Sequence, residues 1–96
     1  MKTPSEILTD AADLIERDGW RQGRGSQGQC ATSAIWEANR TEGIPKTAQA
    51  HAETEALSAL RDVINRHAIP KWNDGPGRTK EEVVSALREA ARRAAT

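Results

Sequence analysis

The stretch from Trp72 to Thr79 constrains the fold most, because it interrupts two strongly helical segments. Its sequence is Trp-Asn-Asp-Gly-Pro-Gly-Arg-Thr, which combines an aromatic ring with several turn-forming residues. The side chains of Asn73 and Asp74 can bond to nearby backbone N–H groups in a turn. Thr79 and Glu82 have the spacing of a capping box, which begins a helix. The chain is therefore predicted to turn here and to enter its last helix directly after Thr79.

Apolar residues recur at helical spacing in four segments of the 96-residue chain. The first segment begins with a capping box and a proline between Thr3 and Glu6, and it is predicted to end at Gly19 in a left-handed conformation. The other helices are predicted over residues 30–39 and 48–67, and after Thr79. Val, Ile and Thr are too scattered to indicate a sheet. The sequence thus predicts an all-α protein, a compact bundle of about four helices forming one domain over residues 1–96.

Three tryptophans carry all the aromatic packing, since the chain has no Phe and no Tyr. A buried aromatic side chain of this kind removes roughly 150–250 Å² from water. Trp20 and Trp72 are predicted to pack against the core at the ends of helical segments. Trp36 lies about 100° around its helix from Ile35, off the centre of the apolar stripe. Two interpretations of Trp36 stay open: it covers the edge of the core, or it is exposed to bind a partner protein.

Fourteen basic and fourteen acidic residues cancel in the net charge. This balance argues against a protein that binds duplex nucleic acid mainly through phosphates, which requires a basic face. The charges are unevenly placed, because residues 1–18 are acidic and the last helix carries Arg88, Arg92 and Arg93. The two end helices are predicted to present solvated faces or to attract each other. No apolar run approaches membrane length and no signal-peptide core is present, so a cytoplasmic protein without a membrane partner is expected.

Residues 21–29 form a loop with three glycines and no large apolar side chain. Its Gly-x-Gly-x-x-Gly pattern matches a dinucleotide-binding motif, but a helix precedes it where that motif requires a strand. The loop leads into a helix N-terminus and carries Arg21 and Arg24, a combination able to hold a phosphate or carboxylate. The alternative is an ordinary solvent-exposed loop.

The sequence offers little support for metal binding or catalysis. Cys30 is the only cysteine, which excludes an intramolecular disulfide and a Cys-rich metal site. The pair His51 and Glu53 has the spacing used by zinc deaminases, but the further cysteine ligands of that chemistry are missing. Asp74 is the only plausible acid or base in a loop, with no His or Lys spaced to assist it. We therefore expect no metal, no cofactor, no catalytic residue and no enzymatic activity.

Two sets of short motifs resemble a known family. The first runs from Ala11 to Gly23 and includes the Gly19-Trp20 step. The second comprises the Trp72-Asn73-Asp74 segment, the following Pro-Gly-Arg-Thr, and apolar positions of the last helix. Together they resemble an uncharacterised family of small proteins of actinobacteria and their phages. The resemblance covers both ends, about half of the chain, and is weak over residues 24–68. It implies an actinobacterial or phage context and carries over no catalytic residue.

A non-enzymatic binding protein is the function that these observations favour, acting as a phage or bacterial accessory factor. If the two loops 20–29 and 69–78 meet, their side chains would line one pocket for a small anionic, nucleotide-like ligand. The residues of this predicted pocket are Trp20, Arg21, Arg24, Trp72, Asn73, Asp74 and Arg78. In a second form of this hypothesis, the protein binds no small ligand, and a host protein docks on Trp36.

The alternatives are a DNA-binding regulator that uses the last helix, and an enzyme. Homo-oligomers are plausible, because a chain of this size has a small core.

Overall fold

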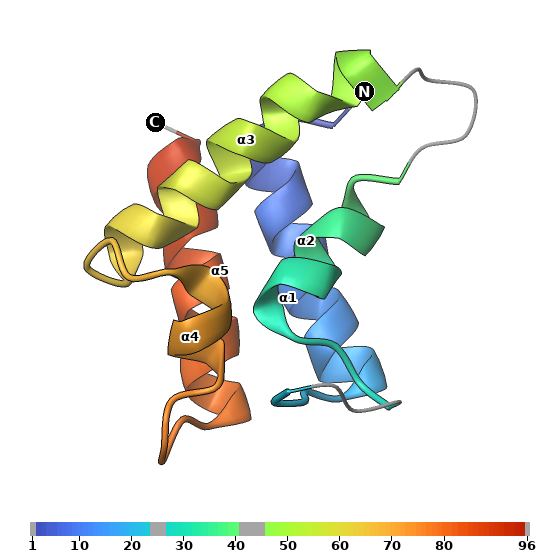
Figure 1. The fold of residues 1–96 in the computed structure, drawn as a ribbon. Helices are drawn as coiled ribbons and strands as arrows, with labels where there is room; N and C mark the ends of the chain where they lie inside the picture. Colours follow the sequence, from blue (N-terminus) through green and yellow to red (C-terminus); the bar gives the residue numbers. More distant parts are fainter. Residues whose placement is uncertain (1, 24–26, 41–45, 96) are drawn as a thin grey trace.

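Five helices follow one another along the part of the chain that the computed structural model describes, residues 2–23, 27–40 and 46–95 (side chains of 46–48 excepted). They are α1 (Pro4–Asp18), α2 (Ala31–Ala38), α3 (Lys46–Val63), α4 (Ile69–Asn73) and α5 (Lys80–Ala94) (Figure 1). These described ranges contain no β-strand, only an isolated bridge between Trp20 and Gln29. The all-α prediction is confirmed, and the predicted count of about four helices omits the short α4.

The first and last helices form an antiparallel pair, which is the most extensive helix contact in the described structure. Near the start of α1, the Ser5 hydroxyl donates a hydrogen bond of 2.8 Å to the backbone oxygen of Ala91 near the end of α5. One face of the pair carries Arg88, whose guanidinium lies 2.9 Å from Asp13 and 3.0 Å from Glu16. The acidic start and basic end of the sequence therefore attract each other across this pair.

The core is built mainly from small and branched aliphatic side chains of α1, α2, α3 and α5. Figure 1 shows α3 crossing the α1–α5 pair near both chain ends, while α2 lies beside α1. The largest fully buried apolar side chains are Ile7, Leu8, Ile15, Ile35, Leu60, Val83 and Leu87. Alanines fill most of the remaining core positions, which lets the helices approach one another closely. Trp20 and Trp72 pack against this core at its edge, as the sequence predicted.

Local sequence signals set the starts of α1 and α5 correctly, whereas α3 begins at Lys46, two residues before its predicted start. In α1 the Thr3 hydroxyl accepts from the Glu6 backbone N–H, and the Glu6 carboxylate accepts from the Thr3 N–H. The same reciprocal pair forms between Thr79 and Glu82 at the start of α5. At the end of α1, Gly19 has a positive φ of 94° with a ψ of 165°. This backbone conformation favours glycine, but it is extended and not the left-handed helical turn that we predicted.

The connection between α3 and α5 differs from the sequence prediction in two ways. α3 ends at Val63 instead of continuing to residue 67, because Asn65 and Arg66 both adopt positive φ, 59° and 62°. The Arg66 N–H donates to the Arg61 oxygen at 2.6 Å, which closes the helix in a Schellman-type turn. The start of the predicted loop 69–78 is the short α4, which begins with buried Ile69 and has a proline in its first turn.

Candidate functional site

The two predicted loops meet, and Asn73 at the end of α4 is the residue on which they converge. Asn73 is 1% exposed, although it is polar. Its side-chain oxygen accepts from the indole N–H of Trp20 at 2.8 Å and from the backbone N–H of Ala31 at 3.0 Å. Its side-chain nitrogen donates to the backbone oxygen of Arg21 and to the Asp74 carboxylate, each at 3.0 Å. One carboxamide thus joins the end of α4, the loop after α1 and the start of α2.

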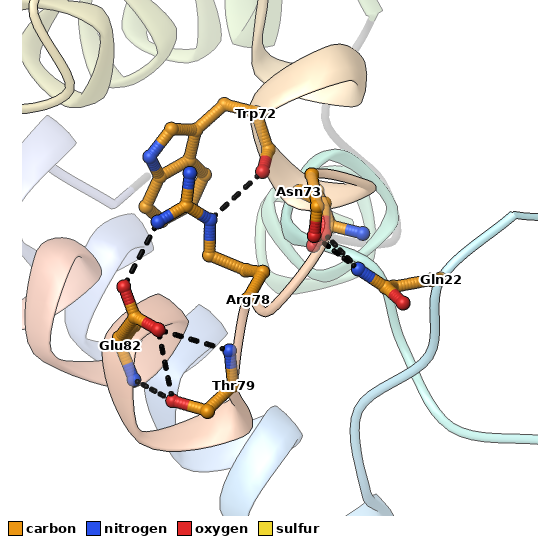
Figure 2. A network of polar contacts seen from close by, with 7 residues as sticks. Gln22, Trp72, Asn73, Arg78, Thr79 and Glu82 are labelled. Carbon is orange, nitrogen blue, oxygen red and sulfur yellow. Dashed lines mark hydrogen bonds and ion pairs between the residues drawn. The ribbon is translucent and has the colours of Figure 1, made fainter.

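Further hydrogen bonds join the same loops on their exposed side. The side-chain nitrogen of Gln22 donates to the backbone oxygens of Asn73 at 3.2 Å and Gly75 at 3.0 Å (Figure 2). The Gly23 backbone N–H donates to the Asp74 carboxylate at 2.9 Å. We did not select Gln22 as a site residue from the sequence, although it stands in the first of the two family-like motifs. An isolated glutamine in a loop gives no signal of a partner 51 residues away.

The end of the loop after α1 packs against the start of the same loop at Gly28. Gly28 has a φ of 79°, and a Cβ atom there would lie 3.0 Å from the backbone oxygen of Gly19. This approach allows the backbone bonds between Gln29 and Gly19 and between Arg21 and Gln29. The Arg21 guanidinium turns into the loop, where it donates to the Gly28 oxygen at 2.9 Å. The last glycine of the Gly-x-Gly-x-x-Gly pattern is therefore required by the loop itself.

The N-terminus of α2 is occupied by groups of the protein. Cys30 is its cap residue, and its sulfur accepts from the Ser33 N–H at 3.4 Å. The Ala31 N–H is bonded to Asn73, as described above. Backbone donors that the sequence assigned to a bound phosphate are thus used inside the fold. Arg24, the remaining cation of the predicted phosphate site, lies outside the described residues.

Asp74 is exposed at the surface of this contact, where hydrogen bonds stabilise its charged form. The Gly23 N–H and then the Asn73 amide lower the pKa of its carboxyl group below the ordinary value. A general acid or base that works near neutral pH needs the opposite shift, because an ordinary carboxyl pKa is about 3.9. The environment of Asp74 fits a turn-stabilising carboxylate better than an acid–base catalyst.

Trp72 and Arg78 face away from the Asn73 contact and form a second cluster with Glu82 (Figure 2). The Arg78 guanidinium lies 4.4 Å from the centre of the Trp72 ring system, within the range of a cation–π interaction. It also donates to the Trp72 backbone oxygen at 2.9 Å and pairs with Glu82 at 2.9 Å. Both side chains border an open groove of about 830 Å³ between the end of α3 and α5.

The predicted pocket is therefore divided. Trp20, Arg21, Asn73 and Asp74 come together, but through hydrogen bonds to one another and to nearby backbone. Trp72 and Arg78 belong to the groove on the other side of the 69–78 segment. The sequence indicated that the loops could meet, but spacing along the chain could not show which polar groups each loop would satisfy in the other.

Trp36 is the exposed aromatic side chain of the described structure. It lies on α2 next to fully buried Ile35 and is 56% exposed, alone among the large hydrophobic side chains of the described residues. Of the two interpretations left open by the sequence, the structure supports the exposed position. A large apolar ring held on a rigid helix is a common anchor in protein interfaces.

A family profile described as DUF6197, a family of unknown function, matches residues 1–93. The chain belongs to this family. The matched range includes the middle segment, residues 24–68. Searches of curated proteins and of solved structures each returned no match. DUF6197 therefore supplies no activity or ligand, and the functional argument rests on the geometry of this chain.

Two further observations bear on this member of DUF6197. No three His, Cys, Asp or Glu side chains within the described ranges gather closely enough to hold a metal ion. Across the same ranges, no helix is long and apolar enough to cross a bilayer.

Proposed function

We propose that the protein is a non-enzymatic binding module that docks on a partner protein through Trp36. The observation that carries the proposal is the 56% exposure of this ring in a chain whose other large apolar side chains are buried or half-buried where described. Exposing an indole to water is unfavourable, whereas covering it in an interface releases roughly 25 cal/mol for each Å² of apolar surface. Tryptophan is enriched among the residues that dominate binding energy.

The family-like motifs support a more specific setting for this module. They resemble motifs of small proteins from actinobacteria and their phages, so we propose an accessory factor that acts in the cytoplasm of such a cell. A phage-encoded copy would act on a protein of its host.

Two other candidates from the sequence receive less support. A phosphate-containing ligand would need free donors, but the Gly23 and Ala31 N–H groups bond to side chains of the 69–78 segment, and the Arg21 guanidinium bonds within its own loop. A DNA-binding regulator would need free cations on α5, but Arg88 pairs with Asp13 and Glu16, and Arg92 and Arg93 both pair with Glu89. Thermal shift with a panel of nucleotides tests the first candidate, and a gel shift at physiological salt tests the second. A raised melting temperature with a nucleotide, or tight DNA binding in the gel shift, would make that candidate better supported than protein binding.

A photo-crosslinking amino acid at position 36 tests the proposed function directly. In a lysate of an actinobacterial host, we expect one discrete crosslinked product from position 36 and none from position 54, an exposed residue of α3. The partner identified in this way should bind the purified protein, and Trp36→Gln should weaken that binding at least tenfold, corresponding to about 1.4 kcal/mol. Thr54→Gln is the matched control. Equal binding by the Trp36→Gln variant with an unchanged circular dichroism spectrum would exclude Trp36 as the docking residue.

A further inference from the structure

The helix α2, which carries Trp36, has little to stabilise it by itself. It has eight residues, and isolated helices shorter than about 12–15 residues are only marginally stable in water. Its buried face consists of three alanines and Ile35, so it buries little apolar surface against the other helices. Its last turn contains no basic residue to interact with the negative end of the helix dipole. The position of α2 therefore depends on side chains from other parts of the chain.

Such side chains hold α2 at both ends. At its start, the Ala31 N–H donates to the buried Asn73 carboxamide, as described above. At its end, the Lys2 ammonium donates to the backbone oxygen of Ala38 at 2.7 Å, which satisfies a carbonyl of the last turn. Lys2 also pairs with Asp10 of α1 at 2.8 Å. One ammonium group thus ties the end of α2 to α1 and supplies the cation that the last turn of α2 lacks.

Trp36 lies between these two attachments, two residues before Ala38. We propose that Lys2 is a positioning residue for Trp36, an inference that rests on the proposed function. By fixing the last turn of α2, the Lys2 bond holds the indole in one place before a partner arrives. A side chain that is already ordered loses less conformational freedom on binding, which raises the affinity. Lys2 acts through the backbone of α2 and not through contact with the partner.

A second attachment at the same end of α2 goes to α3. The side-chain nitrogen of Asn39 donates to the Gln49 backbone oxygen at 3.2 Å and to the Glu53 carboxylate at 3.3 Å. Asn39 is 3% exposed, so a change there would disturb the core as well as the attachment. The side chain of Lys2 is 36% exposed, and its replacement leaves no cavity. Lys2 therefore allows the attachment to be tested in a folded protein.

Amide hydrogen exchange in the free protein tests the local effect of Lys2. Lys2→Met keeps a long side chain but removes the ammonium. The Asn39 amide bonds to the Ile35 oxygen in the last turn of α2 and should exchange about fivefold faster in this variant. The Leu87 amide of α5 should change little, and Lys2→Arg should restore the rate at Asn39, because it keeps a cationic donor. Unchanged exchange at Asn39, or an equal acceleration at Leu87, would overturn the proposal.

Binding measurements then test the consequence for Trp36. The probe is the protein captured by crosslinking from position 36, and titration calorimetry measures its affinity for each variant. We expect Lys2→Met to weaken binding about threefold and Lys2→Arg to keep the original affinity. Lys71→Met is the matched control, because Lys71 is exposed on α4 and has no hydrogen bond or ion pair with a described residue.

The outcomes distinguish this proposal from the proposed function. If Trp36→Gln weakens binding and Lys2→Met does not, Trp36 remains the docking residue and the positioning role of Lys2 is wrong. If Trp36→Gln binds as tightly as the original protein, or no partner is captured, the proposed function fails and the role of Lys2 fails with it. An equal loss of affinity in Lys2→Met and Lys71→Met would show an effect of net charge and would also reject the positioning role.

Discussion

At the scale of single residues, Asn73 joins three segments with one side chain. Its carboxamide makes four hydrogen bonds while it is 1% exposed. A buried amide satisfied on both its oxygen and its nitrogen rigidifies the structure, but loss of the amide leaves its partners unpaired. The carboxamide of Asn73 suggested a ligand-binding role in the sequence, but in the structure its hydrogen bonds stabilise the fold.

Asn73→Ala should lower the free energy of unfolding by about 2–3 kcal/mol, because the Trp20 indole N–H and the Ala31 N–H lose their acceptor. Gln22→Ala removes two hydrogen bonds from the exposed side of the same contact and should cost less than about 1 kcal/mol. Urea denaturation followed by circular dichroism measures both. The central role of Asn73 would be wrong if the two variants lost equal stability.

At the scale of elements, α1 and α5 begin where short local motifs place them. The capping boxes at Thr3 and Thr79 involve residues three apart, so their hydrogen bonds form wherever the following segment is helical. α4 shows the limit of such signals. It has only five residues and no side-chain cap, and buried Ile69 fixes its position against the rest of the fold.

Thr79→Ala should cost about 1 kcal/mol of stability, because the Glu82 N–H loses the hydroxyl that caps α5. Thr79→Ser keeps an equivalent oxygen and should retain most of that stability. Thr54→Ala is the control, since Thr54 is exposed within α3 and alanine is the better helix former. Guanidinium denaturation compares the three variants. A loss in Thr79→Ser as large as in Thr79→Ala would contradict the capping explanation.

At the scale of the whole molecule, the helices share one core. The Cα radius of gyration is 12.4 Å, close to the value of about 12.5 Å expected for a compact chain of this length. α1 contacts α2, α3 and α5, so its loss would expose apolar surface on each of them. Because alanines make up much of the core, we expect modest stability, as is usual for small domains.

We expect the whole chain to unfold in one cooperative transition, as the single-domain prediction requires. Far-UV circular dichroism follows the helices, while indole fluorescence follows Trp20 and Trp72 at the edge of the core. The two denaturation curves should coincide. Separate midpoints for the two signals would show that part of the chain unfolds independently, and the single-domain prediction would fail.

The sequence by itself determined the all-α class, the apolar faces of the long helices and the capped starts of α1 and α5. These features depend on residues within one or two helical turns of one another, so their spacing along the chain records them. The sequence also selected Asn73 as a turn-forming residue of a predicted ligand pocket, and it left two interpretations of Trp36 open.

Only the tertiary structure decided what those residues contact. The bond between the Trp20 indole and Asn73 joins residues 53 positions apart, and the exposure of Trp36 depends on which neighbours cover α2. A polar side chain in a loop has the same appearance in a sequence whether it bonds to a ligand or to the protein. Packing of the helices brings the two loops within hydrogen-bond distance of each other. Most of the residues of the predicted ligand pocket therefore bond to one another or to nearby backbone, and these bonds stabilise the fold.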